Sequence, residues 1–238
     1  MSPSRQSFNE TLLFQSPRFE VEEATILRAA YGALAEGKRV SAADLARRAD
    51  VPVEAITRYF ARWPSGVIMG ADGRIDGCFG LSVTPTPHLF EIGRRRLYTW
   101  CAWDGLFIPR VVGKTARLSS ACPVSGEAIV LLVAPNGVLD ADPDTAVMSF
   151  LASFDPAGNG TGACCRYIHF FASAEATRRW QAGHPTGCVL TMQQAWSLAR
   201  TFVDTKVLAA GTAASPEQDY GRAPNEQSIA DLGKYGVG

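Results

Sequence analysis

The spacing of apolar residues predicts a helical beginning to the chain. Residues 20–37 repeat apolar side chains every three or four positions and end in Gly37, the pattern of an amphipathic helix with a C-terminal stop. Ser41 is the expected N-cap of a second helix, and the Val51-Pro52 pair separates it from a third. These residues therefore predict a helix-turn-helix.

Two short β-like runs follow around the Asp72-Gly73 pair, which is typical of a hairpin turn. A winged-helix-like module is therefore expected over residues 1–83. Residues 1–63 contain nine basic and eight acidic residues, which is weak electrostatics for contacts with phosphate. DNA is thus not the expected partner, and the alternative is a helical packing module of the same shape.

The second part of the chain mixes both periodicities without regular alternation. The proline-rich segment 84–88 is the expected hinge between modules, and residues 94–109, 174–183 and 191–207 have helical spacing. Residues 111–120, 127–135 and 164–173 are rich in β-branched and aromatic residues, as in strands. We expect an α+β fold with an antiparallel sheet in a catalytic domain over residues 84–208, followed by a polar tail over 209–238.

Composition narrows the class of protein. Hydrophobic residues make up 47% of the 238 residues, enough for a core, and 23 basic residues balance 23 acidic ones. The chain lacks a secretory leader and an apolar run long enough to cross a bilayer, so no membrane partner and a cytoplasmic location are expected. The six cysteines are then thiols rather than disulfides, and their spacings do not match a zinc site.

A cysteine and a carboxylate lie three positions apart in an aromatic segment, YTWCAWDGLF. If residues 97–108 are helical, Cys101 and Asp104 share one face. Burial among tryptophans would raise the pKa of Asp104 toward neutrality, so that it could take the proton of the thiol. The alternative is a buried packing cysteine beside a capping aspartate, and these two residues do not decide between them.

The adjacent pair Cys164-Cys165 is either two separate packing residues or a site for a soft metal, because neighbouring cysteines rarely bridge each other. On a strand the two side chains would point to opposite faces, so only one could meet Cys101. Periodicity does not say which one. His169 is expected to be a core residue, and His88 to lie in a loop.

The segments WCAWD, SSAC and CCRYIHFF occur in this order, and over residues 20–207 the chain closely resembles the organomercurial (alkylmercury) lyases. The resemblance implies that Cys101, Asp104 and Cys164 cleave the carbon–mercury bond of organomercurials to give a hydrocarbon and Hg(II). It also implies that Cys122 is structural. The longer N-terminus and tail depart from the family pattern, and Cys78 and Cys188 match nothing in it.

The same resemblance implies which residues contact the substrate and the product, and which cofactors and partners the reaction needs. Trp100 and Phe107 would contact the organic group, and Hg(II) would remain on Cys101 and Cys164, with Asp104 as a further ligand. No organic cofactor or resident metal is expected; external thiols would be needed for turnover, and a mercuric reductase would receive Hg(II). Two alternatives stay open, a thiol-based metal-sensing helix-turn-helix regulator and a passive mercury-binding protein.

Overall fold

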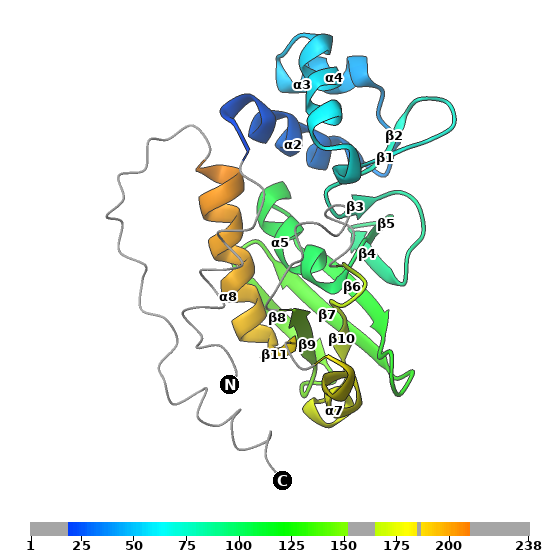
Figure 1. Cartoon of the computed structure of the whole chain (residues 1–238), viewed down its shortest axis with the longest axis vertical. Helices are drawn as coiled ribbons and strands as arrows, with labels where there is room; N and C mark the ends of the chain where they lie inside the picture. Colours follow the sequence, from blue (N-terminus) through cyan, green and yellow to red (C-terminus); the bar gives the residue numbers. More distant parts are fainter. Residues whose placement is uncertain (1–18, 152–164, 185–186, 210–238) are drawn as a thin grey trace.

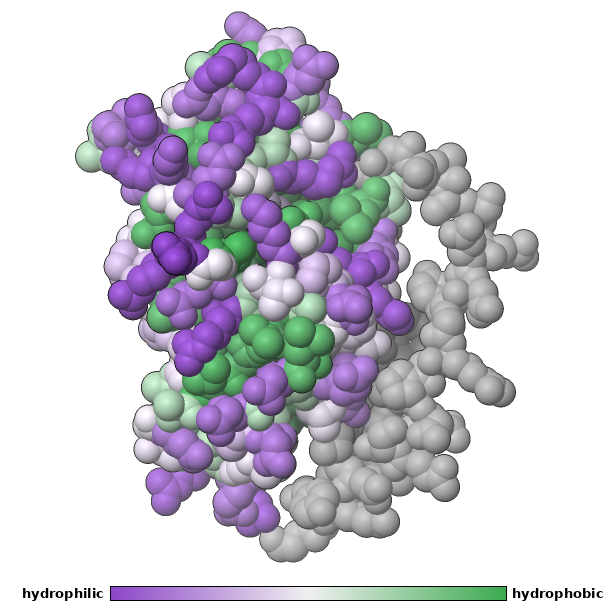
Figure 2. All heavy atoms as spheres, turned by 180° about the vertical axis from the view of Figure 1, so that it is seen from behind, coloured by the Kyte–Doolittle hydropathy of each residue, from purple (hydrophilic) through white to green (hydrophobic). Residues whose placement is uncertain are grey.

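The structure is a computed structural model that describes residues 19–151, 165–184 and 187–209. Figure 1 shows a group of helices at one end of the molecule and two β-sheets with further helices at the other. The described residues contain no helix long and apolar enough to cross a membrane. On the face drawn in Figure 2, apolar areas are separated by polar side chains.

The three N-terminal helices predicted from the sequence are present, and the winged-helix-like arrangement stays a prediction. Ser41 caps the second of them, its hydroxyl accepting a hydrogen bond from the backbone N–H of Asp44 at 3.1 Å. Asp50, in the left-handed conformation, ends that helix just before Pro52, which begins the next. The elements are α2 (Val21–Leu34), α3 (Ala42–Ala49), α4 (Val53–Arg62) and the 3-10 turn η1 (Pro64–Gly66).

An eight-stranded sheet, with all of its neighbouring strands antiparallel, runs through most of the molecule in the order β1-β2-β3-β5-β4-β6-β7-β8. Its first two strands form the hairpin that the Asp72-Gly73 turn predicts. Because β3 pairs with β5, one sheet joins both sides of the expected hinge, and the domain boundary at 83–84 stays a prediction. The strands are β1 (Val67–Met69), β2 (Ile75–Cys78), β3 (Leu81–Ser82), β4 (His88–Ile92), β5 (Arg95–Thr99), β6 (Ala116–Ala121), β7 (Ala128–Ala134) and β8 (Gly137–Asp142).

A second, antiparallel sheet has the order β10-β9-β11 and carries the C-terminal part of the fold. Helix α5 packs between the large sheet and α8, and Figure 1 shows these two helices side by side. The α+β class with antiparallel sheets is thus confirmed. The remaining elements are α5 (Ala102–Val112), β9 (Val147–Leu151), β10 (Phe170–Phe171), α7 (Ala174–Gly183), β11 (Gly187–Thr191), α8 (Met192–Phe202) and the π-helical turn η2 (Val203–Leu208).

Three local expectations outside residues 164–173 were wrong. The arginine-rich segment predicted to begin a helix is strand β5, and α5 begins only at Ala102. The predicted strand over 111–120 begins only at Ala116, because α5 continues to Val112. His88 is not in a loop: it begins β4, is buried, and its Nδ1 lies 2.7 Å from the Ser120 hydroxyl.

Candidate active site

Cys101 and Asp104 meet at the beginning of α5. Cys101 is the N-cap of the helix, in extended conformation, and Asp104 is its third residue. The Asp104 carboxylate accepts a hydrogen bond from the Cys101 backbone N–H at 3.0 Å, one half of a capping box. The two residues are therefore brought together as predicted, although by a helix cap and not by a helix that contains both. At this position the thiol lies at the positive end of the helix dipole, which favours its thiolate.

The Asp104 carboxyl group is buried, with 7% of the residue exposed. Burial raises its pKa from the ordinary 3.8 to about 7, against the opposing effect of hydrogen bonds from the Cys101 side chain and from the backbone of Cys101 and Trp100. The predicted rise of this pKa is confirmed in direction. A carboxyl group that titrates near neutrality can both accept and donate a proton at the pH of a cell.

A second thiol completes the cluster, and it belongs to Cys165. Ligand atoms of Cys101, Asp104 and Cys165 all lie within 4.8 Å of one another. The segment that carries Cys165 is attached to the beginning of α5, because the Ala102 backbone N–H donates to the Ile168 carbonyl at 3.3 Å. The Ile168 N–H in turn donates to the Cys165 carbonyl at 3.2 Å, which closes a turn.

This turn corrects the predicted strand over residues 164–173. Of the described residues in this range, only Phe170 and Phe171 are in a strand, and Cys165 lies in the helical turn before it. Strand alternation therefore does not govern which cysteine faces Cys101. Cys164, the residue that the family motif indicates, lies outside the described residues, and its role stays a prediction. The sequence contained no pattern that singled out Cys165, because the contact depends on the turn between Cys165 and Ile168.

The two aromatic residues expected at the substrate have different surroundings. Phe107 is buried in an aromatic cluster, with its ring centroid 5.2 Å from that of Phe202 and 6.4 Å from that of Tyr31. Trp100 directly precedes Cys101 and is partly buried. Its indole N–H is buried without a hydrogen-bond partner among the described residues. The contacts of Phe107 indicate a core residue, and contact of either residue with the organic group stays a prediction.

Thr99 fixes the backbone at the cysteine. Its hydroxyl is fully buried and donates to the Cys101 carbonyl at 3.0 Å. The Thr99 carbonyl accepts from the Thr86 hydroxyl at 2.6 Å. These two hydrogen bonds connect the N-cap to the end of β5 and to the segment before β4, so that the thiol is held on a rigid frame.

The other described cysteines have separate surroundings. Burial raises the pKa of Cys78 and of Cys188 to about 12, which keeps both as thiols. Burial also acts on Cys122, but hydrogen bonds from Ser125 and from backbone groups outweigh it and lower its pKa. Over the described part of the chain, the Cys101–Asp104–Cys165 cluster is the one group of three or more side chains of metal-ligating type.

Two sulfur donors with a neighbouring carboxyl group define a thiol enzyme or binding protein for a soft metal, because soft cations prefer thiolates to imidazole or carboxylate. Comparison with known proteins identifies which kind. The family model described as alkylmercury lyase matches residues 81–204. The chain belongs to this family, which is a family of enzymes.

Individual relatives agree. The alkylmercury lyase of Staphylococcus epidermidis is 37% identical over 167 residues, which are 70% of this chain and 76% of that protein. The alkylmercury lyase of Streptomyces lividans is 36% identical over 171 residues, 72% of this chain and 78% of that protein. The crystal structure of the mercury-bound form of MerB2 has a TM-score of 0.65 at 27% identity, covering 82% of this chain and 97% of that one. The predicted family and enzyme class are thus confirmed.

Proposed function

We propose that this alkylmercury lyase cleaves the carbon–mercury bond of organomercurials by protonolysis at the Cys101–Asp104–Cys165 cluster. The observation that carries the proposal is the meeting of two thiols and one carboxyl group within 4.8 Å. The thiols bind mercury, and the carboxyl group supplies the proton that the departing carbon requires. Cys165 is the second thiol of this cluster among the described residues, and Cys164, which the family motif indicates as the second sulfur ligand, stays a proposal beside it.

The first step is thiol exchange on mercury. The substrate arrives as an alkyl- or arylmercury cation bound to an external thiolate. Cys101 replaces that thiolate, and its proton passes to the Asp104 carboxylate, whose oxygen is held beside it by the helix cap. Cys165 then adds as a second sulfur ligand, and the departing external thiolate takes its proton. The result is an organomercurial bound to two sulfurs beside a protonated acid.

The second step breaks the carbon–mercury bond. Two thiolates increase the electron density on the mercury-bound carbon, which makes that carbon basic enough to accept a proton. Asp104 delivers the proton, the electron pair of the carbon–mercury bond forms the new carbon–hydrogen bond, and the hydrocarbon leaves. Hg(II) stays between Cys101 and Cys165. A pKa of about 7 suits Asp104 to both proton transfers.

Turnover requires removal of Hg(II) from the two sulfurs. Small cellular thiols are the proposed carriers, since further thiolates are the ligands that compete best for this cation. We also infer a role in mercury detoxification in the cytoplasm, with a mercuric reductase as the acceptor of the product. Trp100, next to Cys101 and partly buried, is the better placed of the two aromatic candidates to contact the organic group.

The N-terminal helices support an enzyme over a metal-sensing regulator. In a helix-turn-helix, the second helix lies in the major groove of DNA, beside the phosphates, and its side chains contact the bases. Here Arg58 and Arg62 of α4 form ion pairs with Glu22 and Glu23 of α2, at 3.1 and 3.3 Å. Both arginines, which would have to contact phosphate, are therefore paired with acidic groups. This pairing weakens the attraction of α4 for DNA.

The test is to incubate the reduced protein with phenylmercury and excess small thiol, and to measure benzene by headspace gas chromatography. We expect many molecules of benzene per molecule of enzyme. Stoichiometric mercury binding without benzene would contradict the proposal and indicate a passive mercury-binding protein. Mercury-dependent binding of a DNA operator without benzene would instead indicate the regulator.

A further inference from the structure

The segment that covers the Asp104 carboxyl has an unusual backbone. Phe79 and Gly80 form a corner between β2 and β3, with φ angles of +37° and +100°. Both residues are thus in the left-handed region, which a bulky residue such as phenylalanine rarely adopts. Such conformations persist only where the surroundings hold them, and they are concentrated at functional sites. We call residues 79–80 the Phe79–Gly80 corner.

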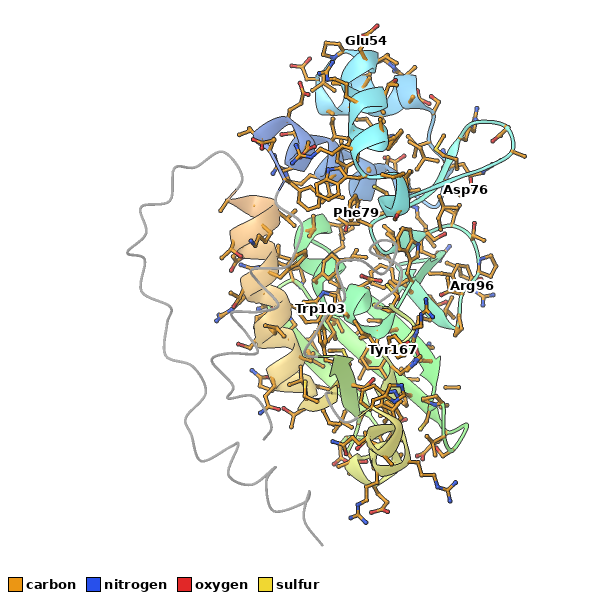
Figure 3. All side chains as sticks on the ribbon, viewed as in Figure 1. Glu54, Asp76, Phe79, Arg96, Trp103 and Tyr167 are labelled. Atoms are coloured by element: carbon orange, nitrogen blue, oxygen red, sulfur yellow. The ribbon has the colours of Figure 1, made fainter. Side chains whose placement is uncertain are left out.

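Hydrogen bonds from three parts of the chain hold this corner. The Phe79 N–H donates to the Gly66 carbonyl at 2.8 Å. The Phe79 carbonyl accepts from the Tyr31 hydroxyl at 2.7 Å, and the Gly80 carbonyl accepts from the Trp100 N–H at 2.9 Å. Tyr31 belongs to α2 and is only 1% exposed. Figure 3 shows Phe79 where the N-terminal helices meet the sheet.

The corner also packs directly on the acid. A Cβ atom added to Gly80 would lie 2.3 Å from Asp104 Cγ and 2.5 Å from Asp104 Oδ1. No side chain fits in this space, so glycine is required both by its φ angle and by the contact. The main chain of Gly80 therefore forms one wall of the place that the carboxyl group occupies.

We propose that Tyr31 is a positioning residue for the proton donor: its hydrogen bond to the Phe79 carbonyl holds the Phe79–Gly80 corner against the Asp104 carboxyl group. This inference rests on the proposed function of Asp104. The N-terminal helices would then contribute to catalysis, because Tyr31 of α2 donates the hydrogen bond that holds the Phe79–Gly80 corner. The Tyr31 hydroxyl donates to the Phe79 carbonyl, so Tyr31 is proposed to act on Asp104 through the corner, and Asp104 also lies close enough to raise the Tyr31 pKa.

The groups that titrate around Asp104 come from several elements. Cys101 is on its own helix, and Cys165 approaches from the turn before β10. Tyr31 approaches from α2, and Cys78 lies close enough to Tyr31 to influence it. The Tyr31 pKa is raised by burial first, and then by the neighbouring Cys78 and Asp104, so its hydroxyl stays protonated and able to donate.

The first test is Tyr31→Phe, which removes the hydroxyl and keeps the ring. The freed corner should admit water to Asp104, lower kcat between about 10-fold and about 100-fold, and move the titration of the Asp104 carboxyl to lower pH. That titration is followed by carbon-13 NMR of the aspartate carboxyls, with Asp104→Asn to assign the signal.

Tyr59→Phe is the matched control. Tyr59 is another buried tyrosine that packs on Phe79, with 6.1 Å between ring centroids. Its hydroxyl lies beside the Cys78 thiol and is not bonded to the corner. We expect near wild-type kcat and an unchanged Asp104 titration for this variant.

The second test is Gly80→Ala, whose Cβ atom must displace the carboxyl group by about an ångström, at a cost of about 100-fold in kcat. Gly93→Ala is its control: Gly93 has a φ angle of +59°, and its added Cβ atom would meet nothing within 4 Å. This control carries the backbone strain without the collision, so its kcat should stay near that of the wild type.

An unchanged Asp104 titration in Tyr31→Phe would overturn the inference, whatever happens to kcat. So would a loss of kcat that Tyr59→Phe shares, since that would show a general effect on the core. The NMR titration needs no turnover. If the wild type released no hydrocarbon, the proposed function would fail while the link between Tyr31 and Asp104 could still be measured.

Discussion

Replacing Asp104 by asparagine should change how the stability of the protein depends on pH. The pKa of the buried carboxyl group is about 7 in the folded protein against an ordinary value of 3.8. Below the lower value the group is protonated in both the folded and the unfolded chain, and burial of its charge costs nothing. As the pH rises toward 7, the unfolded chain releases this proton while the folded protein keeps it, so stability is lost.

The size of the effect follows from the two pKa values. A difference of roughly three units, at about 1.4 kcal/mol per unit, gives a loss of about 4 kcal/mol that is complete above pH 7. This is a large share of the roughly 5–15 kcal/mol that stabilises a typical domain. Asparagine carries no charge at any pH, so Asp104→Asn avoids the loss. The variant should gain about 4 kcal/mol over the wild type between about pH 4 and about pH 8.

Urea unfolding under reducing conditions, repeated across this pH range, measures the difference. Asp140→Asn is the control, because Asp140 is an exposed carboxylate on β8. Plotted against pH, the free energy of unfolding of Asp140→Asn should run parallel to that of the wild type. If the Asp104→Asn curve is also parallel to the wild type, the carboxyl group does not titrate near neutrality, and its assignment as the proton carrier loses its physical basis.

Two cysteine substitutions separate catalytic from structural thiols. Cys165→Ser should abolish hydrocarbon release, because one sulfur ligand of the described cluster is lost. If Cys164→Ser abolishes release and Cys165→Ser does not, the second sulfur ligand is Cys164, as the family motif indicates, and the proposed role of Cys165 is wrong. Cys122→Ser should leave kcat near the wild-type value and lower the free energy of unfolding by about 1 kcal/mol, because burial of the more polar hydroxyl is offset in part by hydrogen bonds from Ser125 and from backbone groups. A large loss of kcat at unchanged stability would contradict a structural role for Cys122.

The helical elements could be predicted from the sequence because their signals are local. Ser41 is followed at the expected spacing by the group that it caps, and Pro52 cannot continue the preceding helix. The segment before Cys101 was assigned wrongly because apolar residues at helical spacing also occur in it. Pairing of β5 with both β3 and β4 decides its conformation. The pairing with β4 closes across the two-residue turn Gly93-Arg94, a local hairpin signal that the helical interpretation of this segment overlooked.

The active site was predictable in part for the same reason. Cys101 and Asp104 are close in sequence, so their meeting at the end of a helix follows from local geometry. The second thiol depends on how a distant turn attaches to α5, through the Ala102 to Ile168 hydrogen bond. The contribution of Tyr31 could not be predicted from the sequence, because Tyr31 acts through the backbone of a corner 48 residues away.

The most direct test of the account is a single turnover of phenylmercury by wild type and Asp104→Asn side by side, with bound mercury and released benzene both counted against protein. We predict that the wild type retains one mercury and releases one benzene, while the variant retains mercury and releases almost none. Benzene release by Asp104→Asn at a near wild-type rate would show that Asp104 is not the proton donor, and the proposed mechanism would be wrong.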